Sequence, residues 1–200
     1  MNTSEEIIAR MRRDAVEIFN HSLEAVDPKN CILRYCQREG SLLHIDSRTF
    51  DLDGFETVIV AGAGKAAASM AKGVEELLGD RITRGLVIVK YDHLEPLDHV
   101  SIIEAAHPVP DENGVKGSHQ LLRLFKEADE KTLIVHLVSG GGSALMALPA
   151  EGISLENKQA ATRVLLGCGA TIHEINTIRK HLSRVKGGQL ARAAYPATLA

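Results

Sequence analysis

Residues 57–64 read Thr-Val-Ile-Val-Ala-Gly-Ala-Gly, and a lysine, Lys65, follows directly. The stretch changes from β-branched apolar side chains to glycines, which is typical of a buried strand that ends in a tight turn. The next residues, 65–78, read KAAASMAKGVEELL and have the composition and spacing of a helix. This part of the chain therefore predicts a strand, a glycine loop and a helix in that order.

Three more apolar runs follow at intervals: GLVIVKY at 85–91, VSIIEAAHP at 100–108 and TLIVHLV at 132–138. A helical pattern that includes Leu121, Leu122 and Phe125 separates the last two. Continuous apolar strands that alternate with helices indicate a parallel sheet covered on both faces. We therefore expect an α/β fold: a doubly wound, mainly parallel sheet with helices on both faces, Rossmann-like and three-layered.

The residues before this sheet predict helices and a hairpin. A capping box at Thr3 opens a long amphipathic helix that runs up to Pro28, and we expect its apolar stripe to lie in the core. A shorter helix should end near Gly40. Two strand-like pieces at 42–45 and 49–52 then predict a small hairpin or edge feature.

The residues after 154 read as three helices. The first is SLENKQAATRVLL, the second is capped by Thr171 with Glu174 three residues later, and the third is GGQLARAAY. The last letters, PATLA, resemble the start of a strand. We expect residues 1–200 to form a single N-terminal α/β domain of a longer protein, truncated at its C-terminus.

Composition excludes several classes of function. The chain of 200 residues is 44% hydrophobic and 24% charged, with a formal net charge of -3. We therefore expect no nucleic-acid partner and no anionic membrane partner. The N-terminus lacks the apolar core of a signal peptide, and no run has the length of a membrane span, so we predict a cytoplasmic protein.

The three cysteines, Cys31, Cys36 and Cys168, lack the spacing of zinc ligands. The first two fall on the predicted short helix. We expect reduced cysteines that serve packing, and no metal site made by these side chains.

The first glycine loop, from Gly62 through Gly64 to Lys65, predicts an anion site. Free backbone N–H groups and the positive end of the following helix would face a ligand above the sheet edge. The pattern G-x-G-x-x-A also fits a dinucleotide fingerprint with Asp92 as the ribose partner, or a tight turn without a ligand. Lys65 favours phosphoryl transfer, because such sites use a mobile point charge against the transferring group.

A second glycine loop follows the strand at 132–138. It reads Ser139-Gly140-Gly141-Gly142-Ser143, and it combines glycines, which let a phosphate approach the backbone, with hydroxyl donors. Two such loops at the carboxyl ends of strands in one sheet should border the same crevice, where open α/β sheets bind their ligands. Together they predict an anionic ligand.

Two further segments carry polar side chains. The loop from His107 to Gly114 presents His107 and Asp111, with Asp111 alternatively acting as a helix cap. On the second late helix, Asn176, Arg179 and Lys180 share one face, and Ser183 and Lys186 would join Arg179 if the helix continued. This basic face could bind a carboxylate or phosphate, or simply be a solvated surface.

Taken together, the motifs GAGKAA, HPVPDENG, SGGGSAL and INTIRKHLSRVKGGQLA resemble the N-terminal portion of the glycerate 2-kinase family. Members of that family have a C-terminal domain named for its MOFRL-type motif and once bore the name hydroxypyruvate reductase. The resemblance implies transfer of the γ-phosphoryl group of ATP to the 2-hydroxyl of D-glycerate, with a divalent cation such as Mg²⁺, to give 2-phosphoglycerate.

The resemblance also assigns roles to residues of this chain. It implies that Lys65 is catalytic and that the phosphates contact the two glycine loops, at Gly62, Gly64, Ser139, Gly140, Gly141, Gly142 and Ser143. The substrate-binding residues would be Asn176, Arg179 and Lys186. Because family members are about twice as long and place part of the active site beyond these residues, we expect this chain alone to bind ligand weakly and to turn over poorly.

Two other functions stay open at the level of sequence. One is an NAD(P)H-dependent hydroxypyruvate reductase that uses Gly62 to Ala67, which Lys65 and the second loop argue against. The other is a non-catalytic fragment that binds nucleotide and forms a homodimer through its first helix.

Overall fold

Five parallel strands form the central sheet in the computed structural model, which describes residues 3–200. They are β4 (Thr57–Ala63), β5 (Arg84–Lys90), β6 (Ser101–Ala105), β7 (Thr132–Val138) and β8 (Thr198–Leu199). Their order across the sheet is β6-β5-β4-β7-β8, and every neighbouring pair is parallel. The predicted parallel sheet is confirmed, including the strand that begins in the last residues.

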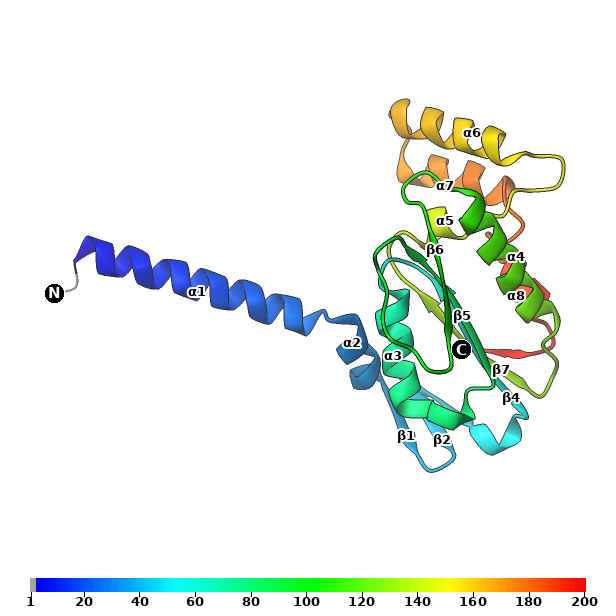
Figure 1. The fold of residues 1–200 in the computed structure, drawn as a ribbon, viewed down its shortest axis with the longest axis horizontal. Coiled ribbons are helices and arrows are strands. Elements are labelled where there is room, and N and C mark those ends of the chain that lie inside the picture. The colour runs from blue at the N-terminus through cyan, green and yellow to red at the C-terminus, as the bar shows by residue number, and fades with distance from the viewer. Residues whose placement is uncertain (1–2) are drawn as a thin grey trace.

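Alternation along the strands separates two cores. In β4, Val58 and Val60 belong to the core on one face of the sheet, whereas Ile59 and Ala61 belong to the core on the other. Helix α3 (Ala67–Leu78) packs on the first face, and α4 (Glu112–Lys126) and α8 (Gln189–Ala194) pack on the second (Figure 1). The three-layer arrangement with helices on both faces is therefore confirmed.

The chain order reverses between β4 and β7, because β5 and β6 lie on one side of β4 while β7 and β8 lie on the other. In open α/β sheets this reversal creates a crevice at the carboxyl ends of the strands. The short helix α5 (Gly142–Leu145) and the helices α6 (Leu155–Gly167) and α7 (Ile172–His181) lie beyond that end of the sheet (Figure 1).

A second, antiparallel sheet lies before β4. It contains β1 (Cys36–Glu39), β2 (Leu42–Ile45) and β3 (Arg48–Asp51), so the predicted hairpin is confirmed. The expectation that the preceding helix extends to Gly40 is wrong. Helix α2 (Pro28–Tyr35) ends before Cys36, because pairing with β2 satisfies the backbone of β1 and buries the Cys36 side chain.

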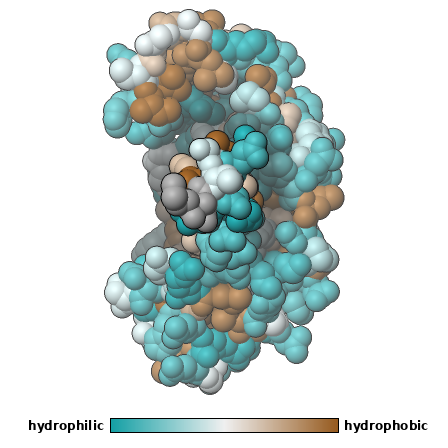
Figure 2. Space-filling view, turned by 90° about the vertical axis from the view of Figure 1, so that its left-hand side faces the viewer, coloured by the Kyte–Doolittle hydropathy of each residue, from teal (hydrophilic) through white to brown (hydrophobic). Residues whose placement is uncertain are grey.

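Helix α1 (Ser4–Ala25) has the predicted capping box but does not contribute to the core. It projects away from the sheet in Figure 1, and Figure 2 looks along it from its N-terminal end. Phe19 is 62% exposed and Ile18 is 68% exposed. Our expectation that its apolar stripe is buried is therefore wrong for residues 3–200. No helix in this range has the length and apolar character to cross a membrane.

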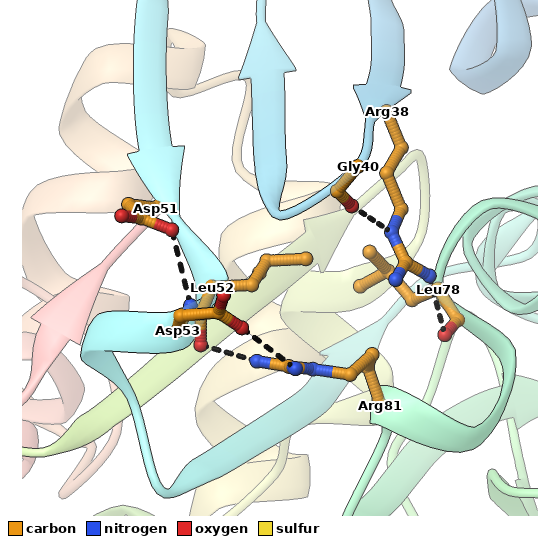
Figure 3. Close-up of polar contacts among 7 residues, drawn as sticks. All are labelled: Arg38, Gly40, Asp51, Leu52, Asp53, Leu78 and Arg81. Atoms are coloured by element: carbon orange, nitrogen blue, oxygen red, sulfur yellow. Dashed lines mark hydrogen bonds and ion pairs between the residues drawn. The ribbon is translucent and has the colours of Figure 1, made fainter.

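Two arginines join the small sheet to the main fold (Figure 3). Arg38 of β1 donates to the carbonyls of Leu77 and Leu78 at 3.3 and 3.2 Å, at the C-terminal end of α3. Arg81 pairs with Asp53 at 3.0 Å and also donates to the Leu52 carbonyl. A cation at a helix C-terminus satisfies carbonyls that lack a helical partner.

We predict that Arg38→Met lowers the free energy of unfolding by about 1 kcal/mol, the usual net contribution of one intramolecular hydrogen bond, because the Arg38 side chain is exposed. Urea denaturation followed by circular dichroism measures this. Arg34→Met on α2 is the matched control, since the Arg34 side chain makes no hydrogen bond or ion pair within the described chain. Equal losses in the two variants would contradict the role assigned to Arg38.

Candidate functional site

The two glycine loops interlock at the carboxyl ends of β4 and β7. The amide of Lys65 donates to the Gly140 carbonyl at 2.8 Å, and the amide of Ala66 donates to Oγ of Ser139 at 3.1 Å. The amide of Gly64 donates to the Ile88 carbonyl at 3.0 Å. The predicted proximity of the loops is therefore confirmed, whereas the expectation of free amides on the first loop is wrong for these residues.

Close backbone approach explains the glycines of the first loop. A Cβ on Gly62 would lie 2.0 Å from the Leu137 carbonyl oxygen of the neighbouring strand. A Cβ on Gly64 would lie 1.9 Å from Ser139 Oγ, and its φ of +150° also disfavours a side chain. These two glycines, which we predicted to bind phosphate, serve in the structure to let β4 and its loop pack against β7.

The free donors lie on the second loop. Among the described residues, the amides of Gly140, Gly141 and Ser143 donate to no protein acceptor, nor does the Ser143 hydroxyl. The Lys65 side chain runs across this loop. Its Cγ lies only 3.2 Å from the position that a Cβ atom on Gly141 would occupy. A mobile ammonium group and several free donors thus share one exposed patch, which is the composition of an anion-binding concavity.

His107 borders the same patch. The Cδ2 atom of His107 lies 3.1 Å from the position that a Cβ atom on Gly141 would occupy. Burial lowers the pKa of His107, and the nearby charges of Lys65, Lys90 and Arg179 lower it further. The imidazole is therefore neutral at pH 7. Lys90, the last residue of β5, was not identified from sequence, although a polar residue at the carboxyl end of a buried strand is a usable signal.

Asp111 acts as the N-cap of α4, the alternative that the sequence left open. Its carboxylate accepts from the Gly114 amide at 2.9 Å and from the Tyr91 hydroxyl at 2.7 Å. Asp92, the ribose partner in the dinucleotide interpretation, lies in the turn after β5, where its amide donates to Glu104 at 2.8 Å. Neither carboxylate contacts the interlocked loops through a hydrogen bond.

Helix α7 forms the other wall of the crevice. Arg179 and Ser143 border two adjoining cavities, one of about 240 Å³ beside His107 and one of about 510 Å³ beside Asn176 and Lys186. The structure therefore brings the basic face of α7 to the second loop, as expected if both bind one ligand. Asn176 is exposed and Arg179 is partly buried.

Lys186 reaches this wall from a turn. The sequence left open a continuous helix from Arg179 to Lys186, but α7 ends at His181. Ser183 instead forms a β-bridge with Pro149, and its hydroxyl donates to the Leu148 carbonyl at 3.3 Å. The chain then turns, and the Lys186 ammonium group donates to the Met146 carbonyl just after α5.

The charged side chains that line these two cavities are all basic. No aspartate or glutamate is among the described residues that line either one. Burial, together with the nearby charges of Lys158 and Arg179, lowers the pKa of Lys186 to about 7. Lys158 was also missed from sequence; it lies on the buried face of α6 with Leu155, Thr162 and Leu165, so a lysine at a core position was the available signal.

Comparison with known proteins now identifies the family. Residues 14–200 match the family described as Domain of unknown function (DUF4147). The chain belongs to this family. A D-glycerate 2-kinase of Thermotoga maritima is 43% identical over 188 residues, which cover 94% of this chain and 42% of that protein. A glycerate 2-kinase of Pyrococcus horikoshii is 38% identical over 182 residues, with coverages of 91% and 40%.

Solved structures of relatives have the same fold. A crystal structure named glycerate kinase, from Thermotoga maritima, matches 96% of this chain with a TM-score of 0.79 and 41% identity. A crystal structure of a Pyrococcus horikoshii protein matches 94% of this chain with a TM-score of 0.84 and 37% sequence identity. The chain spans 42–43% of these two structures. The resemblance to the N-terminal portion of glycerate 2-kinases is therefore confirmed.

We predict that Gly62→Ala destabilises the DUF4147 fold by about 3 kcal/mol, near the upper end for overpacking, because the new methyl group would overlap the β7 backbone. Thermal melting followed by circular dichroism measures this. Gly54→Ala is the control, since nothing lies within 4 Å of its Cβ position. A Gly62→Ala variant with the same melting temperature as the Gly54→Ala control would refute the close approach of β4 and β7.

Proposed function

We propose that this chain provides the phosphate-binding and substrate-binding half of a kinase that transfers the γ-phosphoryl group of ATP to the 2-hydroxyl of D-glycerate. The observation that carries the proposal is the group of free donors on the second loop, beneath the Lys65 side chain and opposite Arg179. The names of the relatives at 38–43% identity support the same activity.

Each group in the crevice has a defined task in this proposal. The amides of Gly140, Gly141 and Ser143 hold phosphate oxygens, and Lys65 places its charge against the phosphoryl group as negative charge shifts during transfer. Arg179 binds an anionic group bidentately, with Asn176 and Lys186 beside it. Gly62 and Gly64 act through packing, because they allow the loops to interlock.

His107 suits the hydroxyl of the acceptor. Its imidazole is neutral at pH 7, because burial and three neighbouring cations lower its pKa. Within residues 3–200 its ring nitrogens make no hydrogen bond. A neutral imidazole can accept a hydrogen bond from a substrate hydroxyl without adding another positive charge to the site.

The described residues do not by themselves fit a divalent cation. Mg²⁺ prefers carboxylate and other oxygen ligands, and the crevice walls carry basic groups. Residues 3–200 contain no group of three histidine, cysteine, aspartate or glutamate side chains that could hold a metal. No carboxylate among the described residues lines the two cavities, so carboxylate ligands for a metal there would have to come from outside these residues. A cytoplasmic location stays a prediction from the sequence.

The reductase alternative predicts a different ligand. A dinucleotide site uses free amides of the first glycine loop, and here the amides of Gly64, Lys65 and Ala66 are already hydrogen-bonded. We therefore predict that calorimetry detects saturable binding of ADP to the chain and none of NADH. Saturable NADH binding that is lost in Asp92→Ala would favour the reductase.

The activity is tested best in a chimera, because the relatives are more than twice as long as the matched region. This chain replaces the matching part of the Thermotoga maritima D-glycerate 2-kinase, to which it is 43% identical. We expect the chimera to form ADP and 2-phosphoglycerate from MgATP and D-glycerate. A folded chimera that forms neither, or that instead oxidises NADH with hydroxypyruvate, would overturn the proposal.

Within the chimera, we predict that Lys65→Met lowers kcat at least ~100-fold, the usual cost of removing a group that stabilises charge in the transition state. Product formation under saturating substrate measures it. Lys116→Met, an exposed lysine on α4, is the control. If both variants keep full kcat, Lys65 is not catalytic.

A further inference from the structure

Lys158 is a buried cation without an anionic partner. Its side chain lies on the inner face of α6, the residue is 6% exposed, and it takes part in no ion pair within residues 3–200. Its ammonium group donates to one neutral group, the carbonyl of Leu182, at 2.7 Å. A buried charge is costly unless it is paired, so a lysine at such a position calls for an explanation.

The contact of Lys158 fixes the end of the helix that carries Arg179. Leu182 is the C-cap of α7, so the hydrogen bond holds this end of α7 against α6. Lys186 makes a corresponding contact on the other side, where it donates to the Met146 carbonyl after the second glycine loop. The two lysines therefore connect α6, α7 and the loop into one wall around Arg179.

We propose that Lys158 is a positioning residue of the anion site, and that the wall it forms with Arg179 and Lys186 is built for a doubly charged oxyanion such as a phosphoryl group. This rests on the proposed function and adds to it a residue that no motif assigned. Lys158 does not line the cavity itself. It acts from behind, by holding α7 and by adding positive potential to the site.

A lysine that only caps the end of α7 would not need to lie close to other cations. A lysine at a helix C-terminus is favourable by itself, but here it is buried close enough to Arg179 for the two charges to repel. Burial and that repulsion lower the pKa of Lys158 to about 8, and Lys186 is affected in the same way. Bound anion would offset the repulsion among all three cations.

The direction of the pH dependence follows from the charges that face Lys186. Lys158 from α6 and Arg179 from α7 act on it directly, and Lys180 and the titratable His173 of α7 line the same cavity. With a pKa of about 7, Lys186 is largely neutral at pH 8 in the free chain. An anion raises its pKa, so binding takes up a proton, and affinity rises as pH falls from about 8 to about 6.

Sulfate is the probe, because it stays a dianion across this pH range and requires neither nucleotide nor glycerate. Chain labelled with ¹³C at the lysine ε-carbons is titrated with acid and base by NMR, with and without sulfate. We expect the pKa of Lys186 and of Lys158 to rise in sulfate. A sulfate titration that leaves both pKa values unchanged would overturn the inference, whereas ADP binding and the kinase assay would test the proposed function separately.

Variants separate positioning from capping alone. In Lys158→Met we expect the pKa of Lys186 in the free chain to rise, because a nearby positive charge is gone. We also expect sulfate to bind ~10-fold more weakly, which corresponds to about 1.4 kcal/mol of binding free energy. Lys158→Arg keeps the charge and should keep affinity within ~3-fold. Lys116→Met is the control. Equal weakening in the Met and Arg variants, without a rise in the Lys186 pKa, would reduce Lys158 to a structural cap.

Discussion

The contact between the loops that follow β4 and β7 is the constraint on which the rest of the site depends. The amides of Lys65 and Ala66 donate to the backbone and hydroxyl of the second loop, and Gly62 lets the β7 backbone approach. With these loops joined, the Lys65 side chain crosses the second loop, whose amides at Gly140, Gly141 and Ser143 donate to no protein acceptor among the described residues. One loop thereby supplies the charge and the other supplies the hydrogen-bond donors.

The charge distribution around this contact gives the site its chemical character. Burial lowers the pKa values of His107 and Lys186, and neighbouring cations add to both shifts: Lys65, Lys90 and Arg179 for His107, and Lys158 and Arg179 for Lys186. Cations placed this close without carboxylates repel one another, which costs stability in the free protein. A site under such strain gains most from a ligand of high negative charge, and this favours phosphate-bearing ligands over neutral ones.

The remaining surfaces lie away from the crevice. The small sheet is fastened by Arg38 and Arg81 at the end of the fold opposite α6 and α7, so it supports α3 without reaching the site (Figures 1 and 3). Helix α1 extends outward (Figure 1), and its apolar side chains are exposed. Apolar side chains are also exposed on α6 and α7, including Val164 and Ile172.

The sequence by itself determined the parallel sheet, the helices on both faces, the capping boxes and the four motifs, because strand period, helix period and caps are local properties. Local patterns could not show that the amides of the first loop are occupied, that the stripe of α1 is exposed, or that residues 36–39 pair as a strand. Lys90 and Lys158 left a local signal in the sequence, a polar residue at a strand end and a lysine at a core position, but not the neighbours that give them a role. These features depend on which segments meet in space, and only the tertiary structure decides that.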